Sequence, residues 1–223
     1  MENYDIRILN TKSLIKNADY VIIGAGAGLS TASGLMYSGE SFYKNYKEFI
    51  EKYNFQDLYT ATFYPFKTET EKWAFWAKMI NLNRFNKPLK LYQELLKLVK
   101  NKEYFVLTTN ADGQFEIAGF EKDRIFATQG DYKFLQCKNA CHNSLYDDEE
   151  MVKDWLKYTE ELEIPEDLVP KCPVCGVYME MNLRKDSNFV QDNKWYEQSD
   201  KYEQFLERTK GKNLVLLEIG ARI

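Results

Sequence analysis

The sequence of 223 residues lacks an excess of positive charge. It contains 30 lysines and arginines against 34 aspartates and glutamates, which gives a formal net charge of −4 at pH 7. A general nucleic-acid-binding surface needs basic side chains gathered on one face to neutralise phosphates. We therefore expect no nucleic acid among the partners of this protein.

Long apolar runs are also absent. No segment approaches the roughly 20 apolar residues that a membrane-spanning helix needs. The N-terminal sequence MENYDIRILN carries acidic residues and no apolar signal core. The chain has no internal repeat and no linker rich in Pro, Gly or Ser. These absences predict a cytoplasmic protein without a membrane partner, built on one substantial core with a small satellite module.

Cysteine and histidine are scarce, with four cysteines and one histidine in the chain. The cysteines form two close pairs, Cys137 with Cys141 and Cys172 with Cys175, and 30 residues separate the pairs. Two such pairs in a reducing compartment predict a structural zinc site with four thiolate ligands. Unliganded core thiols remain an alternative, and His142, next to Cys141, could replace one ligand.

Four short apolar segments are typical of buried parallel strands, at 18–23, 103–108, 125–127 and 213–219. Helix-like segments lie between them, at 30–35, 41–59, 67–83 and from Pro88 onward. This alternation predicts a Rossmann-like parallel α/β sheet with helices on both faces. The stretch 132–196 interrupts it, holds all the cysteines and has an acidic helix-like part at 147–163. We predict a core domain at 1–131 and 197–223 and an inserted zinc-binding module at 132–196.

A glycine-rich turn, Gly24 to Gly28, follows the first predicted strand and precedes a helix. Glycines there let the backbone approach a diphosphate closely, and the amides at the start of the helix donate to its oxygens. Ser30 and Ser33 offer further donors. The alternative is a turn that needs glycine only for its backbone conformation.

Polar residues follow the second predicted strand in the segment 108–113, TTNADG. Ligands of an open α/β sheet bind outside the carboxyl ends of the strands, so Asn110 and Asp112 are placed to meet one. The alternative is that both side chains only cap a turn and the helix after it. The spacing does not decide between the two.

Together these motifs resemble the sirtuin family. Residues 26–35, GAGLSTASGL, resemble its GAGxSxxSGI signature, and TTNADG resembles its TQNIDG motif. The cysteine pairs are similar to its zinc ribbon, and residues 217–220 are similar to the strand before its GTS-type loop. The resemblance implies an NAD-binding core with a structural zinc. The NAD contacts that it implies are Gly26, Ala27, Gly28, Ser30, Thr109, Asn110, Asp112, Gln129 and Gly220.

Two departures from the sirtuin deacylases bear on the chemistry. Residues 36–40 are Met-Tyr-Ser-Gly-Glu where those enzymes have Pro-Asp-Phe-Arg, and Gln129-Gly130 stands where they have a catalytic His-Gly pair. An amide has no useful basicity near neutral pH, although it can hydrogen-bond a ribose. Deacylation needs that base, whereas cleavage of the glycosidic bond of NAD needs mainly positioning and charge stabilisation.

The segments 34–42 and 182–186, with Asn110 and Gln129, are similar to the macrodomain-linked, or class M, microbial sirtuins. That resemblance implies a protein ADP-ribosyltransferase with Asn110, Gln129 and Asp112 as catalytic residues and Arg184 steadying acceptor or cofactor. It also implies a lipoyl-carrier protein as acceptor and a macrodomain hydrolase as partner. Two alternatives stay open: an NAD-dependent deacylase, and a non-catalytic NAD or ADP-ribose sensor. The sensor is suggested by the chain ending at residues 220–223, where the family usually continues.

Overall fold

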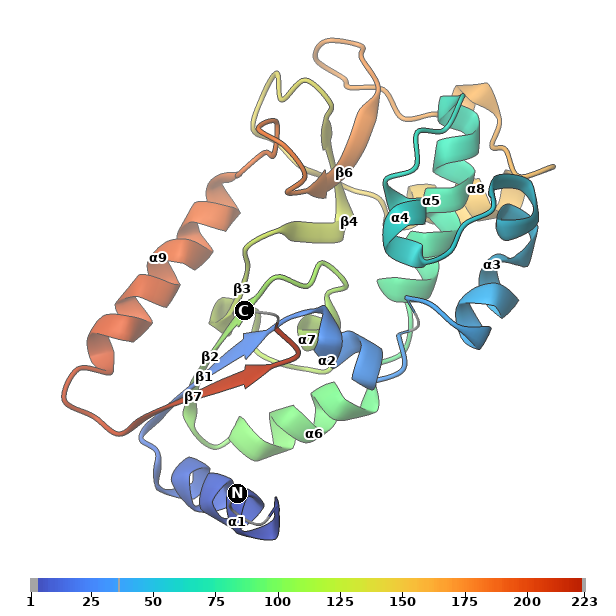
Figure 1. Ribbon diagram of the computed structural model, residues 1–223. Coiled ribbons are helices and arrows are strands. Elements are labelled where there is room, and N and C mark those ends of the chain that lie inside the picture. Colours follow the sequence, from blue (N-terminus) through green and yellow to red (C-terminus); the bar gives the residue numbers. More distant parts are fainter. Residues whose placement is uncertain (1–3, 36, 222–223) are drawn as a thin grey trace.

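The protein is described from a computed structural model that covers residues 4–35 and 37–221. Met36, the first residue of the departing 36–40 segment, lies outside the described residues, as do residues 222 and 223. Four parallel strands form the main sheet in the order β3-β2-β1-β7 (Figure 1). They are β1 (Tyr20–Ala25), β2 (Glu103–Thr108), β3 (Ile125–Ala127) and β7 (Leu214–Ile219). The predicted parallel α/β fold is confirmed.

Helices cover both faces of this sheet, as predicted (Figure 1). On one face, side chains of α2 (Ala27–Ala32), α6 (Lys90–Val99) and α7 (Gln114–Ile117) pack with the strands in one cluster. On the other face, Phe205 of α9 (Asn193–Arg208) packs against Ile22, Phe105 and Phe126. The helix α1 (Tyr4–Asn17) precedes β1, and a short 3-10 helix, η1 (Lys122–Arg124), precedes β3. None of the helices within 4–35 and 37–221 combines the length and apolar character needed to cross a bilayer.

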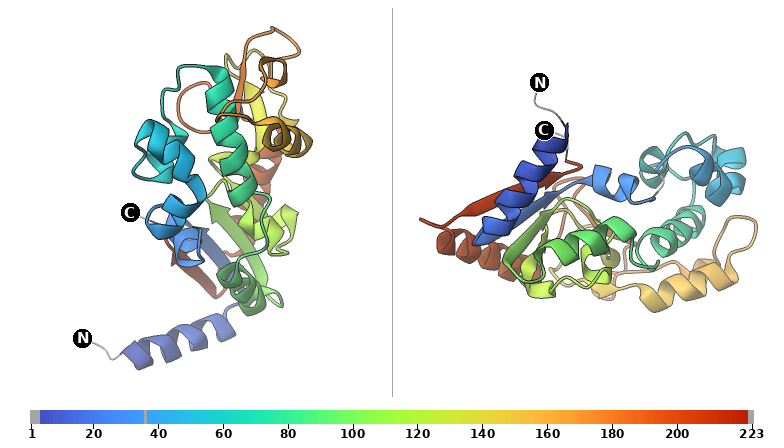
Figure 2. Two further views of the ribbon diagram at one scale, coloured as in Figure 1. Left: turned by 90° about the vertical axis from the view of Figure 1, so that its right-hand side faces the viewer. Right: turned by 90° about the horizontal axis from the view of Figure 1, so that it is seen from below.

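The inserted part has its own antiparallel sheet in the order β5-β4-β6. Its strands are β4 (Gly130–Cys137), β5 (Tyr146–Asp147) and β6 (Met179–Leu183), and it includes α8 (Glu149–Tyr158) and the 3-10 helix η2 (Glu166–Leu168). Three helices from earlier in the chain, α3 (Glu40–Tyr53), α4 (Leu58–Thr62) and α5 (Glu69–Asn83), gather at the same end of the molecule (Figures 1 and 2).

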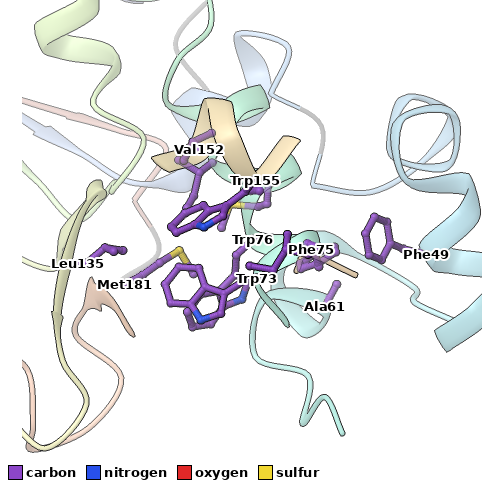
Figure 3. Close-up of a cluster of buried hydrophobic side chains, with 14 of the residues drawn as sticks. Phe49, Ala61, Trp73, Phe75, Trp76, Leu135, Val152, Trp155 and Met181 are labelled. Carbon is purple, nitrogen blue, oxygen red and sulfur yellow. The ribbon is translucent and has the colours of Figure 1, made fainter. Parts of the chain in front are cut away.

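The largest hydrophobic cluster joins these two groups of elements. The rings of Trp73 on α5 and Trp155 on α8 lie 4.8 Å apart, and both side chains are almost completely buried (Figure 3). Leu135 and Met181 pack into the cluster from β4 and β6. The aromatic residues of segment 41–59, including Phe42 and Phe49, also belong to this core. Segment 40–83 and the zinc-binding module therefore form one packing unit.

Local signals explain where the key helices begin and end. Thr68 caps α5 by accepting a hydrogen bond from the Glu71 amide at 3.2 Å, which is half of a capping box. Asp192 caps α9 by accepting from the Trp195 amide at 2.9 Å. Asn54 ends α3 in the left-handed conformation, with φ 57°, so the predicted helical segment 41–59 divides into α3 and α4.

Other predicted boundaries were also displaced. The helix after the glycine turn starts at Ala27 rather than Ser30, and α6 starts after Leu89 rather than at Pro88. The Trp195 ring lies 4.9 Å from that of Phe126 on β3, so the last residues of 132–196 pack against the main sheet. The division of the chain at 132 and 196 stays a prediction.

Candidate functional site

A buried polar network lies at the carboxyl ends of β1 and β2. Ser30 comes from α2 after β1, Asn110 and Asp112 follow β2, and Tyr92 comes from α6. Ser30 Oγ donates to Asp112 Oδ2 at 2.5 Å and lies 2.6 Å from the Tyr92 hydroxyl. Asn110 Nδ2 lies 3.1 Å from the Tyr92 hydroxyl and 3.2 Å from Ser30 Oγ. The parallel sheet thus brings the two sequence motifs together.

Asp112 is the final acceptor of the side-chain hydrogen bonds that join Tyr92, Asn110 and Ser30. Because Ser30 has one hydroxyl hydrogen and gives it to Asp112, the Tyr92 hydroxyl must donate to Ser30, and Asn110 donates to both. The other carboxylate oxygen of Asp112 accepts from the Gln114 amide at 3.0 Å. Burial raises the pKa of Asp112, and the hydrogen bonds from Ser30 and Gln114 oppose that rise.

The orientation of the Asn110 amide follows from the same contacts. The two hydrogens of its Nδ2 are shared among three acceptors, the carbonyl oxygen of Gly26 at 3.1 Å, Tyr92 and Ser30, and the Gly26 carbonyl, which can only accept, assigns this atom as the nitrogen. Its Oδ1 has no hydrogen-bond partner among the described residues. This oxygen is free to accept a hydrogen bond from a ligand hydroxyl.

The glycine turn is in direct contact with the chain after β7. The Gly28 amide donates to the Gly220 carbonyl at 2.9 Å, and the Gly26 amide donates to Ile219 at 3.1 Å. A Cβ on Gly26 would lie 2.7 Å from the Gly220 oxygen. Close backbone approach at this turn is therefore required by the protein itself, in addition to any ligand. The Ala27 amide, at the exposed start of α2, has no partner among the described residues and remains available as a donor.

The remaining predicted ligand residues lie outside the network. Thr109 is exposed, and its amide donates to the Ala25 carbonyl at 3.1 Å. Gln129 is exposed, and its carbonyl accepts from the Arg184 amide at 3.1 Å. Within 4–35 and 37–221 the Gln129 side chain makes no hydrogen bond. Arg184 is exposed and stacks over Phe189, with 5.4 Å between guanidinium carbon and ring centroid.

Two residues of this region had not been predicted. Tyr92 is fully buried, whereas Leu91 and Leu98 of the same helix are 38% and 43% exposed. Tyr92 and the buried Val99 are seven residues apart, so they lie on the same face of the helix. This spacing is the signal that could have identified the buried face. The second residue is Arg84, whose side chain reaches the Asp112 loop from α5. No local pattern marks it.

A cavity of about 320 Å³ adjoins the network. Asn110 and Asp112 lie on its wall, together with Asn182 from β6 and Trp195 from α9. Apolar side chains such as Phe134 and Phe126 line it alongside charged ones such as Glu116 and Lys194. The cavity thus joins the ends of the main strands to the inserted module and is large enough for a side chain or a small ring.

The four cysteines meet at one point of the inserted module. Their Sγ atoms all lie within 4.8 Å of one another, with 3.5 Å between Cys137 and Cys175 and 3.6 Å between Cys141 and Cys172. A tetrahedral zinc with bonds of about 2.3 Å fits between four sulfurs so spaced. The predicted zinc site is thus supported by geometry, and four thiolates would leave no open position.

His142 lies beside this cluster. Its Nδ1 is 3.1 Å from Cys141 Sγ, and its Nε2 is 2.9 Å from the Tyr146 hydroxyl. Because it is the sole histidine of the chain, no histidine is available to the network at Asp112.

Comparisons with known proteins agree with this geometry. A model of the Sir2 family matches residues 26–210. A protein named "Protein ADP-ribosyltransferase" from Staphylococcus aureus (strain Mu50 / ATCC 700699) is 36% identical over 211 residues, covering 94% of this chain and 67% of that protein. A "Probable bifunctional ADP-ribose hydrolase/ADP-ribosyltransferase" from Fusarium oxysporum f. sp. cubense is 32% identical over 218 residues, covering 92% of this chain and 36% of that protein.

A solved structure titled as a Sir2 homolog–NAD complex has the same fold. It superposes with a TM-score of 0.58 at 17% identity and covers 93% of this chain and 71% of that one. At this identity the likeness concerns the fold alone. The family model and the staphylococcal relative, together with the parallel sheet and the four-cysteine cluster, establish that this chain belongs to the Sir2 family.

Proposed function

We propose that this chain transfers ADP-ribose from NAD to a protein acceptor and releases nicotinamide. The observation that carries the proposal is the network of Ser30, Asn110, Asp112 and Tyr92, which has ligand-orienting groups but no histidine to act as a base. Gln129 stands where the deacylases of the family have their histidine. The 36% identity to a protein named as an ADP-ribosyltransferase supports the same assignment.

NAD is the co-substrate of the family, and the carboxyl edge of the sheet offers the groups to hold it. We place its diphosphate at the turn Gly26–Ser30, where the Ala27 amide has no acceptor within the described part of the chain and can donate to a phosphate oxygen. The nicotinamide ribose is placed at Asn110, whose Oδ1 accepts a ribose hydroxyl. Gln129 donates to the same sugar from the opposite loop, and Thr109 and Gly220 border the site.

The reaction breaks one bond and forms one. The glycosidic bond between C1′ of the ribose and the nicotinamide nitrogen breaks, and the bonding electrons leave with nicotinamide. The acceptor side chain then donates an electron pair to C1′ and loses its proton to solvent. Asn110 and Gln129 orient the ribose, and the buried charge of Asp112 stabilises the positive charge that develops on the ring.

The acceptor is a protein, and within that class we propose a lipoyl-carrier protein. The cavity beside Asn110 and Asp112 is lined by Trp195 and Phe134 and suits an acceptor segment with an apolar side chain. We further propose that a macrodomain hydrolase reverses the modification. The combined hydrolase and transferase name of the Fusarium relative supports such a pairing.

The test uses the full chain, NAD labelled in its adenine, and a lipoylated carrier protein. Transfer of label to the carrier, with equal release of nicotinamide, is the expected result. An acyl-lysine peptide assay runs in parallel, and deacylation without transfer to any protein would replace this proposal by the deacylase. NAD binding without nicotinamide release would instead identify a sensor.

A further inference from the structure

Arg84 connects two loops of the proposed site. It is the C-cap of α5, and its side chain is 5% exposed. Its Nε donates to Asp131 Oδ1 at 2.7 Å, and its Nη2 lies 3.3 Å from Glu116 Oε2 on α7. Asp131 comes two residues after Gln129, and Glu116 comes four residues after Asp112.

The guanidinium also lies directly against the backbone of the Asp112 loop. Gly113 has φ +64°, and a Cβ there would lie 2.5 Å from the guanidinium carbon of Arg84. The adjacent backbone of the two loops is linked as well, because the Tyr132 amide donates to the Ala111 carbonyl at 2.9 Å. Arg84 therefore contacts segment 111–116 and segment 129–132 from a third element.

The positive charge of Arg84 lies next to two carboxyl groups, Asp112 and Asp131. Asp112 is buried, the Asp131 side chain is only 19% exposed, and the charge of Asp131 disfavours the ionised form of Asp112. Arg84 is the guanidinium that faces both, and its charge favours both carboxylates. A charged group that is buried without a partner is costly, so the two loops keep this arrangement only with the arginine in place.

We propose that Arg84 is a positioning residue, which holds the loop of Asn110 and Asp112 at a fixed distance from the segment of Gln129. The proposal rests on the proposed function, because both loops are assigned there to the nicotinamide ribose. An error of about 1 Å between two orienting groups is enough to slow such a reaction roughly a hundredfold. Arg84 contacts neither ligand nor reacting atoms in this assignment.

The experiment separates positioning from folding by means of a double variant. Arg84→Gln leaves Asp131 uncompensated and should lower both Tm and kcat. Adding Asp131→Asn removes the uncompensated charge, so Tm of Arg84→Gln/Asp131→Asn should return close to that of the unmodified protein. The bridge that Arg84 makes between the loops is still missing, and kcat for nicotinamide release should remain about tenfold to a hundredfold low, with KM for NAD changed less than threefold.

Two further measurements complete the design. Arg84→Lys keeps the charge but cannot reach both carboxylates, so it should recover only part of kcat. Arg208→Gln is the matched control, because Arg208 is 58% exposed and 3.9 Å from its nearest carboxylate, on Glu103. This control should leave both kcat and Tm unchanged.

Amide hydrogen exchange gives a readout that does not depend on activity. Residues 110–113 and 129–132 should exchange faster in the double variant than in the unmodified protein at equal Tm. The proposed function would be contradicted if the unmodified protein neither transferred ADP-ribose nor released nicotinamide. The exchange rates of the two loops would still show whether Arg84 holds them in place. Unchanged exchange, or recovery of kcat together with Tm, would overturn the positioning role.

Discussion

The Gly28 amide and the Gly220 carbonyl oxygen are hydrogen-bonded at 2.9 Å, which fixes the turn after β1 against the chain after β7. Neither residue has room for a side chain. A Cβ on Gly28 would lie 2.8 Å from Gly220 Cα. A Cβ on Gly220 would overlap with backbone atoms of Gly28 and Leu29. Gly220 also has φ +64°, a conformation that residues with a side chain rarely adopt.

Gly28→Ala should therefore weaken NAD binding at least tenfold and lower Tm, because the turn must move away from Gly220. Gly24→Ala is the matched control, since a Cβ there makes an ordinary contact at 3.8 Å with the Leu217 oxygen. Calorimetric titration with NAD and thermal unfolding of both variants check this. Gly28→Ala with unaltered NAD affinity would show that the diphosphate is not held at this turn.

Purified protein should contain about one zinc per chain, bound by Cys137, Cys141, Cys172 and Cys175. Removal of the metal by a chelator should lower Tm markedly, because a structural site contributes its binding energy to folding. His142→Ala should retain the zinc, since four thiolates complete the tetrahedron. Metal analysis by emission spectroscopy gives the answer, and loss of zinc in His142→Ala would make the histidine a ligand.

Asn110→Ala and Gln129→Ala should both slow ADP-ribose transfer. Each removes one well-placed hydrogen bond to the ribose, worth on the order of 1–3 kcal/mol, or roughly tenfold to a hundredfold in rate. Asn110→Ala should have the larger effect because it also removes the hydrogen bonds that Gly26, Ser30 and Tyr92 accept from the Asn110 amide. The steady-state rate of transfer of labelled ADP-ribose measures both effects. Equal rates in the two variants and the unmodified protein would exclude ribose-orienting roles for Asn110 and Gln129.

Gln129→His introduces the base that deacylation requires. In an assay with acyl-lysine peptides and NAD, this variant should show deacylation above the level of the unmodified protein. Gln129→Asn, which keeps the amide, is the control and should show none. Strong deacylation by the unmodified protein would mean that the amide at position 129 is no obstacle to that chemistry.

Asp147 and Asp148 are neighbours with opposite environments. Asp147 is half-exposed and lies 3.0 Å from Lys133 Nζ, whereas Asp148 is fully buried and its carboxylate oxygens accept no hydrogen bond from the residues that the structure describes. Burial, reinforced by Asp131 and Asp147, raises the pKa of Asp148 to about 8. The folded state therefore binds a proton that the unfolded state releases, and stability contributed by this group falls as pH rises from about 4 to about 8.

Asp148→Asn should match the unmodified protein in stability near pH 4 and exceed it near pH 8.5, by on the order of 2–5 kcal/mol. Asp147→Asn is the control with the opposite sign. The pKa of Asp147 is lowered, because the hydrogen bonds from the Glu149 amide and Lys133 outweigh desolvation, so this variant should lose more stability at neutral pH than at pH 3. Urea unfolding across this range measures both. If the difference in unfolding free energy between Asp148→Asn and the unmodified protein did not change with pH, the raised pKa of Asp148 would be refuted.

The sequence was sufficient where the signal is local. The strands at 103–108 and 125–127 were predicted to the residue, because β-branched and aromatic runs bounded by turn residues leave little choice. The cysteine pairs were also recognisable, since two short spacings bring the ligands of each pair together before any tertiary structure forms.

The rest depends on contacts between residues far apart in the chain. Tyr92 lies 62 residues from Ser30, and its hydroxyl role becomes visible only when α6 packs below the sheet. The same holds for Arg84 and Asp131, 47 residues apart. Neither pairing is marked by a periodicity or a short spacing in the sequence. Composition and pattern could therefore locate the loops proposed to bind the ligand, but not Tyr92 and Arg84, which contact those loops from other elements.

The shared core of segment 40–83 and the zinc-binding module has a consequence for synthesis of the chain. Trp73 is packed by Trp155 and Met181, which follow it by about 80 and 110 residues. At translation rates of about 5–20 residues per second, this helix leaves the ribosome several seconds before the residues that bury it. During that interval α5 exposes the apolar side chains of Trp73, Phe75 and Trp76 to solvent, and they become buried only when β6 is complete.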